Sequence, residues 1–238
     1  MTKSRLLKTF LLFLLTSALA GCAAKGFNRG ELKEQLSVLS PTYDDKEIQA
    51  AYEKKQNLPK PFKLAVYFKQ PKTTGFQGPV WRWTDQDREL IESVTKTLKD
   101  QGIAADVFPI ISTLVENESL KSLRMVAAKH QADALLIITG AGQIDRYINN
   151  WGWSYILILP TFFVPGSVAN TLFISSASLW DVKNEYLYLT AETESTISTT
   201  YIPIFGDRDV VLLDHAKSET LEKLKVEINK MLNGTKFH

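Results

Sequence analysis

The residues best suited to catalysis in this chain are Asp214 and His215, an acid and a base that are adjacent in the sequence. In hydrolases an acid–histidine pair activates a hydroxyl nucleophile, which is often marked by a Gly-x-Ser-x-Gly turn. The sequence contains no such turn. His215 also falls near the start of a segment with helical apolar spacing, where a solvated histidine is the simpler expectation. A hydrolase that acts on cell-wall material through this pair is therefore a remote alternative.

Residues that could hold a metal or a nucleotide are equally sparse. The three histidines, His130, His215 and His238, do not share the close spacing of zinc ligands. Gly140-Ala141-Gly142 follows an apolar run, as the glycines of a dinucleotide-binding turn would, but the third glycine of that pattern is missing. We predict a turn or a bulge at these glycines, and we expect no cofactor and no metal.

Carboxylates occur in three close pairs, which are Asp44 with Asp45, Asp85 with Asp87, and Asp207 with Asp209. The first two pairs stand at predicted helix starts, where acidic side chains cap the helix and interact favourably with its dipole. The third pair borders a glycine loop. General acid–base catalysis needs carboxyl groups held in a cleft at a defined separation, which sequence spacing does not indicate. We therefore assign no catalytic residue and expect that the protein is not an enzyme.

The one cysteine of the chain, Cys22, ends the box Leu19-Ala20-Gly21-Cys22. A positive region with Lys3, Arg5 and Lys8 precedes it, followed by an apolar run too short to span a membrane comfortably. Positive residues, an apolar run and small residues, in that order, are typical of a secretory signal. The box resembles the lipobox of bacterial lipoproteins. An uncleaved signal anchor and an ordinary secretory signal are the alternatives.

The resemblance to bacterial lipoproteins implies cleavage before Cys22, a diacylglycerol on its thiol and a palmitate or similar acyl chain on its new amine. Several acyl chains hold a protein stably on a membrane, whereas one binds weakly and reversibly. Residue 23 is Ala and not Asp, which by the same resemblance favours the outer membrane, facing the periplasm. We expect the membrane as a partner through this lipid.

The charge of the mature chain is close to neutral. Residues 1–21 contain three Lys or Arg residues and no acidic ones, so 25 Lys and Arg residues remain against 26 Asp and Glu residues. Such a balance indicates no affinity for nucleic acid.

The length allows one well-packed core. We divide the chain into a signal peptide (1–21), a lipidated tether (22–30), an N-terminal helical segment (31–59) and a single α/β domain (60–234).

The apolar spacing predicts a mixed α/β fold in the order β-α-β-α-β-β-β-α, with one sheet and helices on at least one face. Two short helices broken at Pro41 precede it, and the second begins near Asp44 or Asp45. The strands are expected over 62–68, 103–111, 132–138, 170–182 and 186–201. Helices are expected from the cap Thr84 to Gly102, after the cap Ser119, and over 211–232. Pro109 places the second strand toward an edge, and the polar residues 190–200 indicate another solvent-facing or edge strand.

The stretch 151–166 is almost wholly apolar, uncharged and interrupted by two prolines. Its aromatic residues, and those of the loop 76–83, form the candidate interaction surface: Trp81, Trp83, Trp151, Trp153, Tyr155, Phe162 and Phe163. These rings either cover the core at the open end of the sheet, as large aromatics usually do, or form a surface that meets a partner. A glycan, an envelope protein and the membrane interface are the candidate partners.

A family resemblance rests on Trp153-Ser154-Tyr155, Phe163-Val164-Pro165-Gly166 and Ala177 to Val182. These motifs are similar to the second half of the rhombotarget lipoprotein family, over roughly residues 62–200. That family has no assigned activity, so no catalytic residue is implied. Its members carry a C-terminal sorting tail, which the end of this chain, Lys230 to His238, does not match. More loosely, the element order is similar to the α/β domain of periplasmic assembly lipoproteins, such as the curli-secretion channel subunit.

These observations lead us to expect a lipid-anchored, non-catalytic envelope lipoprotein that works by binding. The alternative is an oligomeric assembly or secretion accessory that pairs through edge strands, so a homo-oligomer is possible.

Overall fold

The computed structural model of the protein describes residues 26–37, 44–71, 81–157, 159–202 and 209–234. The predicted signal peptide, Cys22, Pro41 and His238 lie outside these ranges. The described chain contains α2 (Arg29–Leu36), α3 (Asp45–Glu53), β1 (Phe62–Phe68), α4 (Asp85–Asp100), β2 (Ala104–Pro109), α5 (Leu120–Lys129), β3 (Ala134–Ile148), β4 (Ser167–Asp181), β5 (Leu187–Tyr201) and α6 (Asp209–Gly234). Short 3-10 turns occur at η1 (Ser112–Leu114), η2 (Gly152–Leu157) and η3 (Leu159–Phe162).

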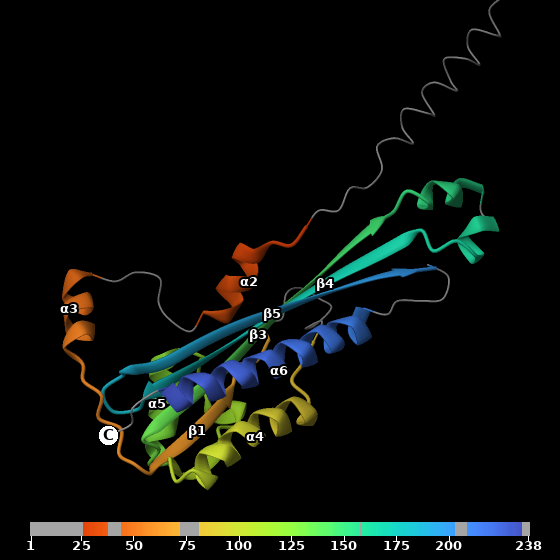
Figure 1. The fold of residues 1–238 in the computed structure, drawn as a ribbon. Coiled ribbons are helices and arrows are strands. Elements are labelled where there is room, and N and C mark those ends of the chain that lie inside the picture. The colour runs from red at the N-terminus through yellow and green to blue at the C-terminus, as the bar shows by residue number, and fades with distance from the viewer. Residues whose placement is uncertain (1–25, 38–43, 72–80, 158, 203–208, 235–238) are drawn as a thin grey trace, which may run out of the picture.

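The strands form one mixed sheet in the order β2-β1-β3-β4-β5 (Figure 1). β1 is parallel to both of its neighbours, and β4 is antiparallel to β3 and β5. The predicted α/β fold with a single mixed sheet is therefore confirmed. β2 and β5 are the edge strands, as Pro109 and the polar residues 190–200 predict.

Helix starts follow their capping residues. Asp44 and Thr84 each cap a helix through a reciprocal pair of hydrogen bonds with the residue three positions later, Glu47 and Asp87 respectively. Ser119 caps α5 by accepting a hydrogen bond from the Ser122 N–H. These bonds satisfy N–H groups that the first turn of a helix leaves free. The helix starts predicted from these side chains are confirmed because capping depends on neighbours in sequence.

Helices cover both faces of the sheet. α4 and α6 pack on one face, against alternate residues of β1 such as Leu64 and Val66. α5 packs on the opposite face, against Ala65 and Tyr67. That opposite face is also covered farther along by α2, whose Leu32 contacts the residues of β3 and β4 around Ala141. Burial on both sides explains why residues 134–138 are continuously apolar and do not alternate with polar residues.

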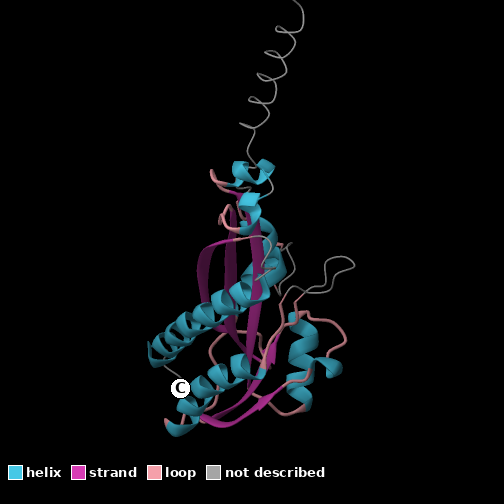
Figure 2. Ribbon diagram, turned by 90° about the vertical axis from the view of Figure 1, so that its right-hand side faces the viewer, coloured by secondary structure: helices cyan, strands magenta, loops and turns pink. Residues whose placement is uncertain are grey.

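Beyond β1 the sheet continues as an arm of three strands, β3, β4 and β5 (Figures 1 and 2). β1 pairs with β3 only as far as Ile138, whereas β3 runs on to Ile148. The expected strand 132–138 was therefore too short, and the expected turn or bulge at Gly140-Ala141-Gly142 was wrong. Both glycines stand in regular register opposite β4. A Cβ atom at Gly142 would lie 2.8 Å from a Leu213 methyl of α6. The absence of a side chain at Gly142 therefore allows α6 to pack closely against β3.

Candidate functional site

The uncharged stretch 151–166 forms the tip of the arm, where β3 turns back into β4 (Figure 2). It is folded into the two turns η2 and η3. The tip lies beyond the helices that cover the rest of the sheet, and no charged residue occurs between Arg146 and Asp181. An apolar segment is thus carried to the far end of the molecule.

Hydrogen bonds brace this tip from inside. The Tyr155 hydroxyl donates to the carbonyl of Val164 at 2.8 Å and accepts from the N–H of Gly166 at 2.6 Å. At the base of the tip, the Asn149 N–H donates to the carbonyl of Gly166 at 2.8 Å, and its side-chain amide donates to Pro165 at 3.0 Å. Segments on either side of the tip are therefore joined by specific bonds, which defines its shape.

Two glycines allow the backbone of the tip to cross closely. A Cβ atom built on Gly166 would lie 2.7 Å from the Cα of Gly152 and 2.7 Å from the Tyr155 hydroxyl. A Cβ atom on Gly152 would lie 3.0 Å from the Gly166 carbonyl oxygen. A larger side chain at either position would push the two backbone segments apart.

Four apolar side chains among the described residues of the tip face solvent. Trp151 is 68% exposed and Phe163 79%, and Leu159 and Phe162 are exposed as well. Tyr155 is half-buried by its bracing role. Trp153 belongs to η2, and its side chain lies outside the described part of the structure. That these exposed residues form an interaction surface remains a prediction.

Trp81 and Trp83 lie elsewhere, in the core, and are only 6% and 7% exposed. Trp81 packs edge-on against Phe173 with the ring centroids 4.9 Å apart, and Trp83 packs in the same way against Phe68 at 5.3 Å. The indole N–H of Trp83 donates to the carbonyl of Lys69 at 2.7 Å. These two residues therefore cover the core. The expectation that they belong to an interaction surface was wrong. Residues 76–80 of that loop lie outside the described residues.

The residues considered for catalysis do not converge. His215 is exposed on α6, and the Asp214 carboxylate lies 3.1 Å from the Nζ of Lys217. His130 ends α5 and its ring packs near Phe108, with the centroids 5.4 Å apart. Among the described residues, no group of three or more His, Cys, Asp or Glu side chains could hold a metal ion.

Sequence reasoning missed a buried ion pair between Lys217 of α6 and Asp87 of α4. Their side-chain atoms Nζ and Oδ2 are 2.8 Å apart, and the ammonium also donates to the carbonyl of Arg82 at 2.8 Å. The signal was available, because Lys217 lies on the same helical stripe as Leu213 and Leu221, which are core residues. The pair joins α4 to α6 and serves the fold.

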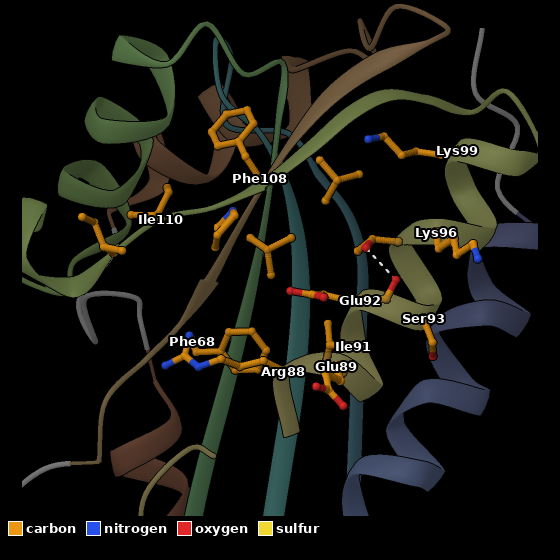
Figure 3. Close-up of a pocket in the computed structure, with 15 residues that line it drawn as sticks. Phe68, Arg88, Glu89, Ile91, Glu92, Ser93, Lys96, Lys99, Phe108 and Ile110 are labelled. Carbon is orange, nitrogen blue, oxygen red and sulfur yellow. Dashed lines mark hydrogen bonds between the residues drawn. The ribbon is translucent and has the colours of Figure 1, made fainter. Parts of the chain in front are cut away.

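A groove of 680 Å³ lies between α4 and the edge strand β2 (Figure 3). Its walls include Phe68, Ile91 and Val107. Charged side chains of α4 line it as well, namely Arg88, Glu89, Glu92, Lys96 and Lys99. Charges of both signs occur along this wall, so the groove presents no single sign of charge to a ligand.

The edge of β2 beside this groove is closed to strand addition. The N–H of Val107 is taken by the Asp106 carboxylate at 2.9 Å, and Pro109 has no N–H. The N–H of Ile110 donates to the carbonyl of Val66 in β1 and so points into the sheet. Because backbone N–H groups along a strand point alternately to its two sides, the nitrogens at positions 107 and 109 belong to the outer edge. Such devices prevent edge-to-edge pairing.

In the described residues, no helix is both long enough and apolar enough to cross a membrane. No protein-family model matches the chain, and no curated protein matches its sequence. The resemblance to rhombotarget lipoproteins therefore stays a prediction.

Similar solved structures include bacterial lipoproteins. A minor lipoprotein from Acinetobacter baumannii is 9% identical with a TM-score of 0.33, over 75% of this chain and 96% of that chain. A PelC dodecamer from Paraburkholderia phytofirmans is 14% identical with a TM-score of 0.33, over 75% and 93%. A homolog of neuraminyllactose-binding hemagglutinin from Helicobacter pylori is 15% identical with a TM-score of 0.39, over 75% and 90%. At these identities and TM-scores the likeness carries no conclusion about function.

Proposed function

We propose that this protein is a lipid-anchored lipoprotein of the bacterial envelope that acts by binding and not by catalysis. The observation that carries the proposal is the tip of the arm, which exposes Trp151, Leu159, Phe162 and Phe163 without any charged neighbour in its segment. Exposed apolar patches of this kind mark contact sites. Since Tyr155 and the two glycines brace the tip before any partner arrives, little conformational freedom is lost on binding.

The anchoring part of the proposal rests on the sequence around Cys22. Residues 1–21 are the signal peptide, residues 22–30 connect the lipid to the body, 31–59 form the N-terminal helical segment, and 60–234 form the α/β domain. The structure places Gly26 and Asn28 against β3, which leaves a shorter connection than the whole segment 22–30. Ala23 favours the outer membrane, with the body facing the periplasm.

Mass spectrometry of the native protein tests the anchor. We expect a mature chain that begins at Cys22 and carries acyl chains there, and we expect the Cys22→Ser variant to lack them. An unmodified Cys22 thiol, or an intact Met1, contradicts the anchoring proposal.

Photo-crosslinking in intact envelopes tests the contact surface. A photoreactive amino acid replaces Phe163 at the tip or, as the control, Val226, which is similarly exposed on α6. We expect adducts from position 163 and not from position 226, and their mass identifies a protein, a glycan or a lipid. Equal yields at the two positions contradict a contact role for the tip.

One observation favours the alternative of an oligomeric accessory. The edge strand β5 is 15 residues long and contains no proline, glycine or lysine, in contrast to the closed edge of β2. Strands of this kind are able to pair with another chain. Light scattering on the purified lipoprotein in detergent distinguishes the two, because a stable ring or large oligomer supports the accessory and a monomer supports the simple binding protein.

A further inference from the structure

We infer that the tip of the arm docks on the lipid bilayer that holds Cys22, so that the protein contacts its membrane at two points. This inference rests on the proposed lipid anchor and names the partner of the same contact surface. Its first support is where the described chain begins. The N–H of Gly26 donates to the Asp145 carboxylate at 3.0 Å, and the N–H of Asn28 donates to the Gln143 side chain at 2.8 Å. The chain therefore enters α2 beside the outer part of β3 (Figure 1).

The reach of the chain places the anchor at the same end of the arm. Gly26 follows Cys22 by four positions in the sequence, and a chain of that length spans at most about 14 Å. Ile148, where β3 ends and the tip begins, is about 10 Å along the strand from Asp145. The opposite end of β3, at Ala134, is about 37 Å from Asp145, which is beyond that reach. The acyl chains on Cys22 thus lie near the tip and away from the Ala134 end of β3.

The chemistry of the tip suits a bilayer surface. Trp151 presents an amphipathic ring, which favours the interface between headgroups and acyl chains, and Phe163 and Leu159 are apolar. A charged group would oppose insertion, and the segment between Arg146 and Asp181 has none. A tethered tip also meets the membrane at a high effective concentration, so weak insertion suffices.

Labelling of the lipidated protein in vesicles tests this inference. Because the lipid occupies the Cys22 thiol, an added cysteine is the single free thiol and accepts a nitroxide label. The tip variant is Phe163→Cys. The control is Val226→Cys, which lies about 25 Å along α6 from Asp209, the partner of Arg146 near the tip. The vesicles contain phosphatidylethanolamine and phosphatidylglycerol.

We expect the nitroxide at position 163 to collide several-fold more often with oxygen, which dissolves in the bilayer, than with an aqueous nickel complex. The label at position 226 should show the reverse. Adding Leu159→Asp to the tip variant should return position 163 to water while the acyl chains stay in the vesicle.

Two results overturn the inference and leave the anchor intact. The first is a label at position 163 that is as open to the nickel complex as the label at 226, in protein whose intact mass shows acylated Cys22. The second is crosslinking of position 163 to an envelope protein or a glycan in place of lipid. A protein without acylation at Cys22 refutes the anchor of the proposed function instead, and the intact mass separates that failure from the other two.

Discussion

Lys217 of α6 and Asp87 of α4 form an ion pair in which Nζ and Oδ2 are 2.8 Å apart. The two residues are 130 positions apart in the sequence, so only the folded chain brings the pair together. The two side chains are 1% and 5% exposed. Asp87 also accepts a hydrogen bond from the Thr84 N–H at 2.7 Å, so it joins the start of α4 to the middle of α6.

Removal of this buried lysine should destabilise the fold strongly. Lys217→Met leaves the Asp87 carboxylate without its cation in a site closed to water, which typically costs about 3–5 kcal/mol. The matched control is Lys223→Met on the same helix, where the pair with Glu219 is exposed to solvent and contributes little to stability. Denaturant unfolding measures both. Equal losses in the two variants would show that the buried pair has no special weight.

A methyl group at the crossing of the tip should disturb the tip and spare the core. In Gly166→Ala the new Cβ meets the Cα of Gly152 at 2.7 Å, and such overpacking costs about 1–3 kcal/mol. Gly30→Ala is the control, because its Cβ meets only ordinary contacts, the nearest atom being 3.5 Å away. Hydrogen exchange should quicken in residues 149–166 of the first variant while the strands near Ile138 stay protected. Unchanged exchange at the tip would contradict the close-crossing geometry.

The contact of α2 with β5 should weaken in acid. Hydrogen bonding by Arg29 of α2 is the main cause that holds the pKa of Glu194 below its usual range. A carboxyl whose pKa is lower in the folded state stabilises the fold above its unfolded pKa, about 4.3, and this contribution is lost as the pH falls through the folded value.

The melting temperature of Glu194→Gln should therefore lie slightly below that of the native chain at pH 6, and the two should converge as the pH falls through the lowered pKa of Glu194. Glu192→Gln serves as the control, since the Glu192 carboxylate and the Lys33 ammonium are 3.8 Å apart and the pair is exposed. A difference for Glu194→Gln that persists unchanged in strong acid would refute the role of its charge.

Docking of the tip should be insensitive to salt. The tip segment carries no charge, so neither ionic strength nor the proportion of anionic lipid should alter the accessibility of a label at position 163. The measurement repeats the collision experiment in low and high salt and in vesicles without phosphatidylglycerol. A loss of bilayer contact in high salt would point to nearby basic residues such as Arg146 as the real attachment.

Local patterns predicted most of the elements correctly. The alternation over Phe62–Phe68 and the caps at Thr84 and Ser119 depend on residues that are close in the chain, and the structure has those elements where the patterns place them. The extent of β3 could not be predicted in this way. Gly140 and Gly142 usually interrupt a strand, but here they face bulky side chains from distant elements and the strand continues past them.

The sequence by itself determined the order of strands and helices, the uncharged character of residues 151–166 and the box that ends at Cys22, because each is a property of neighbouring residues. The tertiary structure decided that Trp81 and Trp83 contribute to the core and that Trp151 does not. Trp81 and Trp83 are enclosed with Phe68 and Phe173, whereas Trp151 is carried beyond the helices by the arm and stays exposed. Burial depends on what long-range packing places over a side chain, and residue type alone does not specify it.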